Sequence, residues 1–506
     1  MVFSSSVFLF GFFPIVLAVY YLVRIARKEF RNATLLILSL VFYAWGEPVY
    51  VALMVVSILT TWGMGRVIDA AGNRKKAYLI LALAIHLAIL GFFKYEGFVA
   101  DNINLLFGYT IVPDLELPLP IGISFFTLQA ITYLVDIYRE KANPQGSLLN
   151  LGLYIAMFPP LIAGPIVRYE TVEDQIKNRE ENLEDFASGL RLFAIGLAKK
   201  VLLADNVALL AKHMLETQPS DIGLIGAWGG IIAYSFQIFF DFAGYSDMAI
   251  GLGKMFGFKY LRNFNYPYIA KSITEFWQRW HISLSTFFRD YVYIPLGGNR
   301  LSKRRWVLNI VLVWGLTGLW HGAAWNFILW GLYYGVFLII EKLFLGRVLE
   351  KLPRAVQHCY AILIFVCGWV FFWISDPAQI AGYFASMLGL HGLTGTMTFW
   401  ELTVWEYWPI FVVCTLASTP VIPWLRGRIE SYVAGQTGVV PAAAPVKGNE
   451  QPPTVSLSLL ALKSSSHRGL VIIVGVVVDV ALFALLVMSA FAIVSGSYSP
   501  FIYFQF

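Results

Sequence analysis

Two histidines lie in unusual segments of the sequence, and His321 is the one whose surroundings favour proton-transfer chemistry. It lies in residues 315–326, a run of Gly, Trp and small apolar residues, between Gly318 and Gly322. Small residues four apart let membrane helices approach closely. Close packing desolvates an imidazole and keeps it neutral, so that a ring nitrogen can accept a proton from a hydroxyl. The sequence therefore predicts His321 as a general base. A histidine that only hydrogen-bonds a neighbouring helix is the alternative.

The second histidine, His281, lies in residues 275–300, a segment that also contains Arg279. Its aromatic residues recur with helical spacing, which predicts an amphipathic helix dipping into the membrane interface. Membrane anchoring is the alternative role of these aromatic residues. For His281 by itself the alternative is a solvated side chain at the interface.

A third polar group, residues 237–248, places Asp241, Tyr245 and Asp247 in an otherwise apolar run. Ionisable residues inside membrane segments are costly and usually functional. We expect a buried hydrogen-bond network or a water-filled cavity here. Cation coordination is an alternative, although we predict no metal site.

The elements that must position these residues are membrane helices. Hydrophobic residues make up 58% of the 506-residue chain and charged residues 13%, whereas soluble domains carry roughly 25% charged residues. Several long apolar runs separated by short loops indicate spanning helices, because lipid requires every backbone group to be satisfied within the helix. The net charge of +6 comes from basic residues in loops beside apolar runs. This pattern sets membrane topology and does not indicate nucleic-acid binding.

The expected fold is an all-α polytopic integral membrane protein with about 10 to 12 membrane helices plus re-entrant or interfacial helices. Residues 1–432 form the membrane core, 433–467 a flexible polar loop rich in Ala, Pro, Gly and Ser, and 468–506 a C-terminal helix and tail. Apolar runs that mark expected helices are 5–23, 33–46, 49–65, 77–93, 188–204, 222–252, 306–341, 355–375, 402–424 and 468–494. Two runs near 118–139 and 148–169 are broken by proline and line protein or water.

Together these patches resemble the membrane-bound O-acyltransferase family, in its bacterial branch of alginate and peptidoglycan O-acetyltransferases. His281 and His321 stand at the separation of the family's two signature histidines. Further matching motifs are residues 119–126, 158–169, 196–205 and 500–506. The resemblance therefore covers most of the chain.

The resemblance implies a membrane core around a central funnel, with His321 as the catalytic histidine and His281 in a supporting role. It implies an acyl thioester donor, with acetyl-CoA expected, and no bound cofactor. Candidate substrate-binding residues are Arg279, near the donor entrance, Asn326 as an oxyanion donor, and Trp320, Tyr245 and Asp241.

The expected function is transfer of acetyl across a bacterial cytoplasmic (inner) membrane for O-acetylation of an exported, alginate-like polysaccharide. Transfer is direct or passes through a periplasmic or secreted acetyltransferase partner within the exopolysaccharide machinery. One alternative is a transporter or flippase that depends on Asp241 and Asp247 and not on His321. D-alanyl transfer to teichoic acid, or a scaffold without chemistry of its own, are the others.

Overall fold

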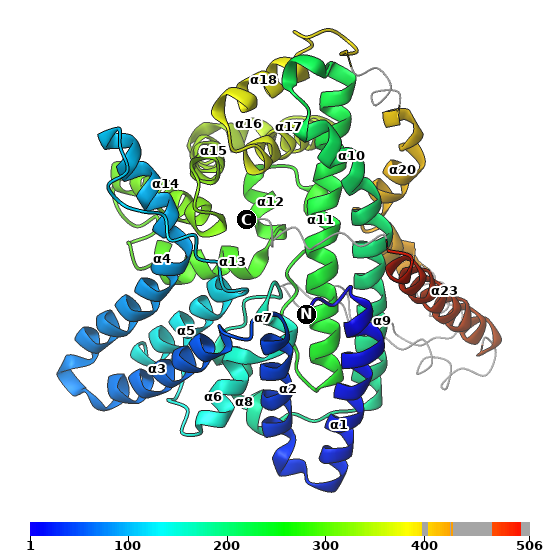
Figure 1. The fold of residues 1–506 in the computed structure, drawn as a ribbon. Coiled ribbons are helices and arrows are strands. Elements are labelled where there is room, and N and C mark those ends of the chain that lie inside the picture. The colour runs from blue at the N-terminus through cyan, green and yellow to red at the C-terminus, as the bar shows by residue number, and fades with distance from the viewer. Residues whose placement is uncertain (397–402, 426, 429–467, 497–506) are drawn as a thin grey trace.

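The computed structural model describes residues 1–396, 403–425, 427–428 and 468–496, and these are helices joined by turns and loops (Figure 1). Within these residues, seven helices are long and apolar enough to cross a membrane. The predicted all-α membrane fold is confirmed, while the total of about 10 to 12 membrane helices stays a prediction. The predicted loop 433–467 lies outside the described residues.

The N-terminal part of the chain folds into helices joined mostly by short turns. These helices are α1 (Phe13–Ala26), α2 (Arg31–Gly46), α3 (Val51–Ala70), α4 (Lys75–Phe107), α5 (Ile123–Tyr138), α6 (Leu148–Ala156), α7 (Phe158–Leu161), α8 (Tyr169–Asn178), α9 (Leu183–Ala198) and α10 (Asp205–Glu216). Their ends follow local sequence signals. α4 stops at Gly108, whose φ of 75° favours glycine, and Ser147 and Asn182 cap α6 and α9 with their side-chain oxygens.

The C-terminal part contains the most buried span and both histidines. Its helices are α11 (Leu224–Met255), α12 (Ile273–Arg279), α13 (Ile282–Phe287), α14 (Lys303–His321), α15 (Trp325–Ile340), α16 (Gly346–Leu349), α17 (Arg354–Trp373), α18 (Pro377–Met387), α20 (Trp408–Ala417) and α23 (Arg468–Val494). The apolar run 306–341, expected as one segment, is divided into α14 and α15 at residues 322–324.

Helix α11 stands at the centre of the fold beside α9 and α10 (Figure 1). Its most apolar stretch is 78% buried, against at most 39% for the other spans among the described residues. Glycines allow α9 and α11 to touch at their backbones. A Cβ on Gly196 would lie 2.5 Å from the carbonyl oxygen of Gly244, and one on Gly251 would lie 2.5 Å from that of Gly189. Larger side chains at these positions would force the two helices apart.

Helices α14 and α15 form a hairpin in which the two helices approach each other equally closely. A Cβ on Gly318 would lie 2.1 Å from the carbonyl oxygen of Phe327, and one on Gly322 would lie 2.1 Å from its ring. The predicted close approach of helices around this glycine pair is therefore confirmed. It fixes the end of α14, where His321 is the last helical residue.

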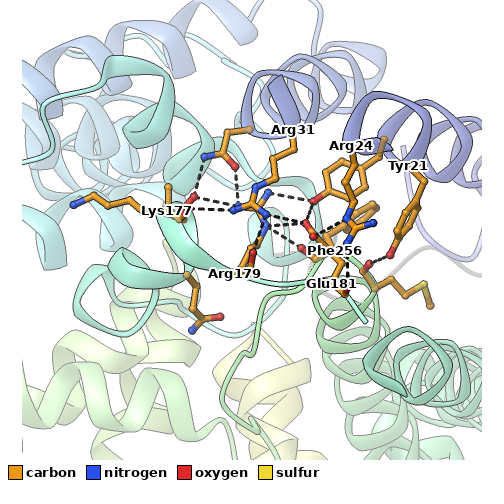
Figure 2. A network of polar contacts seen from close by, with 12 residues as sticks. Tyr21, Arg24, Arg31, Lys177, Arg179, Glu181 and Phe256 are labelled. Carbon is orange, nitrogen blue, oxygen red and sulfur yellow. Dashed lines mark hydrogen bonds and ion pairs between the residues drawn. The ribbon is translucent and has the colours of Figure 1, made fainter. Parts of the chain in front are cut away.

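A buried ion-pair network ties the first two helices to the rest of the fold (Figure 2). Glu181, between α8 and α9, accepts hydrogen bonds from Arg24 at 2.8 Å and from Tyr20, while Arg31 donates to the carbonyl of Arg179 at 2.7 Å. Arg179 also donates to the carbonyl of Phe256, the residue that directly follows α11. Burial raises the pKa of Glu181, but the hydrogen bonds from Tyr20 and Arg24 and the nearby guanidinium groups bring it below its ordinary value. The N-terminal helices are thus anchored by charge as well as by packing.

Residues 275–300 do not form the single interfacial helix expected from their aromatic spacing. They contain α12, α13 and a wide helical turn, Phe288–Tyr293, and the chain breaks direction at His281, whose φ is 42°. Trp277 and Trp280 are 6% and 2% exposed. The expectation was wrong because an aromatic stripe has the same spacing whether it faces lipid headgroups or, as here, the aromatic faces of other helices.

Candidate active site

The structure brings His281 and His321 together from separate elements. His321 ends α14, and His281 lies in the bend between α12 and α13. Their ring centroids are 6.5 Å apart. His281 is 0% exposed and His321 is 5% exposed. The solvated side chain considered for His281 is therefore excluded. The site is a pair of imidazoles inside the protein.

Backbone contacts hold His281 in its left-handed conformation, which non-glycine residues adopt rarely. Asn263, fully buried in the loop after α11, spans the bend. Its side-chain oxygen accepts from the backbone nitrogen and hydroxyl of Ser283 at 3.1 and 2.9 Å, and its carbonyl accepts from Ile282 at 2.9 Å. Both ring nitrogens of His281 are left without a hydrogen-bond partner among the described residues. A residue that its surroundings hold in a strained backbone conformation is typical of a functional site.

Aromatic rings enclose the two imidazoles. The ring of His281 lies 4.7 Å from that of Phe242 and 6.2 Å from that of Trp320. The ring of His321 lies 4.9 Å from that of Trp330 and 5.5 Å from that of Phe372. These rings come from α11, α14, α15 and α17. Together they exclude bulk water, so that a reactive acyl group held here would be protected from hydrolysis.

A cavity of about 550 Å³ lies beside this site, where the resemblance implies a funnel. Its buried part includes Ile282, next to His281, and Thr317, one helical turn before His321. Its lining also includes Arg289, whose side chain is 58% exposed, and the exposed Lys342. The cavity therefore leads from basic surface residues to the neighbourhood of both histidines. Its volume is typical of sites for small organic ligands.

Trp320 lies against both histidines, with its ring centroid 6.2 Å from that of His281 and 5.0 Å from that of His321, whereas the contacts of Asn326 are structural. The side-chain nitrogen of Asn326 donates to the carbonyls of Phe371 and Phe372, at 3.1 and 3.5 Å, in the last turn of α17. Both amide hydrogens thus have acceptors. The predicted role of Asn326 as an oxyanion donor stays a prediction that this geometry does not favour.

Arg279 lies two residues from His281 but is not among the residues that line the cavity. It pairs with Glu275 at 2.8 Å, one turn earlier on α12, and donates to the carbonyl of Asn265 at 3.0 Å. Among the residues that line the cavity, the basic ones are Arg289 and Lys342. Contact between Arg279 and a donor stays a prediction, and these two residues are better placed for it.

Asp241 and Tyr245 belong to a different part of the core. Asp241 pairs at 2.9 Å with Lys200, which also pairs at 2.7 Å with Asp205, and the three side chains are at most 7% exposed. The ring of Tyr245 stacks on that of Phe3 with centroids 4.6 Å apart. The predicted buried polar network is confirmed here, and it holds α11 against the segment that joins α9 to α10. None of its three ion-paired residues is among those that line the cavity.

The comparison with known families assigns this helical membrane protein to the acyltransferases. Residues 139–384 match the model of the MBOAT, membrane-bound O-acyltransferase family, and the chain belongs to this family. Enzymes of this class transfer an acyl group to a hydroxyl. Membership of the family therefore decides against the two alternative functions, a transporter and a scaffold without chemistry of its own.

Among curated relatives, the chain is 38% identical over 512 residues to the probable alginate O-acetylase AlgI of Azotobacter vinelandii. It is 37% identical over 527 residues to the protein of the same name from Pseudomonas aeruginosa. Both alignments cover 100% of each chain. It is also 36% identical over 428 residues to the peptidoglycan O-acetyltransferase of Helicobacter pylori, an alignment covering 78% of this chain and 81% of the relative.

Proposed function

We propose that this protein transfers an acetyl group from a cytoplasmic thioester, acetyl-CoA, to a hydroxyl group that serves the O-acetylation of an exported polysaccharide such as alginate. The observation that carries the proposal is the pair of buried imidazoles beside a cavity with basic residues at its surface. The names of the relatives that match over the full chain support acetyl as the acyl group and alginate as the polysaccharide.

The thioester donor enters through the cavity. Arg289 and Lys342 lie at its exposed part, and Trp306, which follows the basic residues that begin α14, lines it too. Basic loops mark the cytoplasmic side of a membrane protein. Guanidinium and ammonium groups bind the phosphates of a nucleotide-linked thioester, while the tryptophans deeper in the cavity contact its apolar arm.

His321 then acts as the general base. A ring nitrogen of His321 takes the proton of the acceptor hydroxyl as its oxygen attacks the thioester carbonyl carbon. The tetrahedral oxyanion collapses, the carbon–sulfur bond breaks, and the thiolate takes the proton back from the imidazolium. The products are an O-acetyl ester and a free thiol. His281, at 6.5 Å between ring centroids, supports this step by binding the reacting groups with its ring nitrogens.

The acceptor approaches from the opposite face of a bacterial cytoplasmic membrane. It is either a sugar hydroxyl of the polysaccharide or a serine of a periplasmic or secreted acetyltransferase that passes the acetyl group on. The donor side and the acceptor side are thereby separated by His321, which allows an acyl group to cross the bilayer without a soluble intermediate.

The test is acetyl transfer in cells that export alginate and lack their own O-acetylase. Wild-type protein restores acetyl esters on the exported alginate. His321→Ala, present in the membrane at the same level, lowers the acetyl content by at least about a hundredfold, the usual contribution of a general base. Retained acetylation would refute the role of His321. D-alanyl esters on the exported polymer, with acetyl esters absent, would refute the acyl group.

A further inference from the structure

The last turn of α14, which carries His321, is closed by a different helix. The last four carbonyls of an α-helix lack partners within the helix. In α14 the first of them, at Gly318, accepts from the nitrogen of Gly322 at 3.3 Å. The next three belong to residues 319–321, and all three accept hydrogen bonds from α4. The turn under His321 therefore depends on two side chains of α4.

These side chains are neighbours in the sequence. The hydroxyl of Tyr95 donates to the carbonyl of Leu319 at 2.9 Å. The Nζ of Lys94 lies 2.6 Å from the carbonyl oxygen of Trp320 and 3.4 Å from that of His321. An ammonium group at this place also interacts favourably with the negative end of the helix dipole.

The position of Lys94 in the membrane makes this arrangement significant. It lies about five turns, or roughly 28 Å, from the start of α4 at Lys75, well beyond the basic loop that precedes the helix. A lysine on a membrane-spanning helix is costly unless its ammonium group is hydrogen-bonded. Within the described residues, the hydrogen-bond acceptors of its ammonium group are the two carbonyls of α14 and the hydroxyl of Ser124 on α5, at 3.3 Å. The contacts that offset this cost are thus made mainly to the turn of His321.

We propose that Lys94 and Tyr95 are positioning residues for His321. They hold the imidazole beside the donor cavity by fixing the backbone that bears it. Without these donors the carbonyls of α14 would face an apolar interior unsatisfied, and the last turn would unwind or shift. This inference rests on the proposed function, because it assumes that His321 takes part in the transfer.

The experiment measures acetyl transfer from acetyl-CoA in membrane vesicles for Lys94→Met, Lys94→Arg and Tyr95→Phe. Lys75→Met, the same substitution at the first residue of α4, is the matched control. We expect Lys94→Met to lower kcat at least about tenfold, because displacement of a reacting group by about 1 Å costs up to about a hundredfold. The KM for acetyl-CoA stays within about twofold, since α4 does not line the donor cavity.

The conservative variants separate positioning from a general loss of structure. Lys94→Arg keeps a cationic donor and restores at least about half of kcat, and Tyr95→Phe, which removes one hydroxyl, lowers it by about threefold or more. Lys75→Met behaves as wild type. A kcat for Lys94→Met within about twofold of wild type would overturn the proposal. Should Lys94→Met fail to accumulate, an unchanged kcat for Tyr95→Phe would overturn it.

His321→Ala in the same vesicles distinguishes the two proposals. If His321→Ala retains transfer, the proposed function fails and the positioning role fails with it. If His321→Ala abolishes transfer while Lys94→Met and Tyr95→Phe do not lower kcat, the positioning role alone is refuted.

Discussion

Replacing Gly318 by alanine should impair catalysis through the backbone of α14 alone. The added Cβ would lie 2.1 Å from the carbonyl oxygen of Phe327 on α15. Non-bonded carbon and oxygen atoms approach to about 3.3 Å, so α14 and α15 must separate by about 1.2 Å at this point. His321 is three residues further along α14. A displacement of this size at a reacting group lowers kcat by up to about a hundredfold.

The same substitution one turn earlier is the control. A Cβ on Gly315 would have its nearest neighbour, a methyl group of Leu332, at 4.0 Å, which is ordinary contact. Gly315→Ala should therefore leave kcat unchanged, and its better helix propensity adds about 1 kcal/mol of stability.

The assay is acetyl transfer from acetyl-CoA in vesicles with matched amounts of each variant, accompanied by thermal unfolding in detergent. Overpacking costs about 1–3 kcal/mol, so Gly318→Ala remains folded at the assay temperature with a lower unfolding midpoint. Equal kcat values for folded Gly318→Ala and Gly315→Ala would refute the claim that close packing of the hairpin positions His321.

The remaining predictions concern the two buried ion-pair networks. Glu181→Gln removes a carboxylate whose pKa is below its ordinary value, so we expect about 3 kcal/mol lower stability at neutral pH, measured by thermal unfolding in detergent. Ionised Glu181 stabilises the fold at pH values above the pKa that this carboxyl has in the unfolded chain. The difference in stability between wild type and Glu181→Gln should therefore shrink as the pH falls through the lower pKa of Glu181 in the folded protein. A difference in stability that does not change with pH would contradict this. Asp241→Asn leaves Lys200 paired with Asp205 and should keep acetyl transfer within about threefold of wild type. Lys200→Met leaves two buried carboxylates without their cation and should lower the amount of protein in the membrane. Loss of transfer in well-folded Asp241→Asn would contradict the separation of this network from the active site.

Much of the fold follows from the apolar runs of the sequence, because a bilayer forces long apolar segments into helices. The break between α14 and α15 was not predicted, since residues 322–324 are small and apolar and continue the run. Basic residues after α1 predict its cytoplasmic end, but the sequence did not indicate that Arg24 and Arg31 enter a buried network with Glu181. That partner is distant in the sequence.

For the site, His321 was predicted from its own neighbours, because the glycines that pack its helix flank it directly. The bend at His281 was missed, since it depends on Asn263 in a different segment, and an asparagine in a polar loop carries no recognisable signal. Lys94 was missed for a related reason. It follows the apolar run 77–93 directly and resembles its polar end, whereas α4 continues to Phe107.

The central claim is that His321 takes the proton of the acceptor hydroxyl while a thioester occupies the cavity. It is tested most directly by single-turnover acetyl transfer from labelled acetyl-CoA in membrane vesicles, comparing wild type with His321→Ala. The account predicts that the transfer rate falls at least about a hundredfold while the affinity for acetyl-CoA changes by no more than about threefold. A single-turnover rate for His321→Ala close to that of wild type would contradict it.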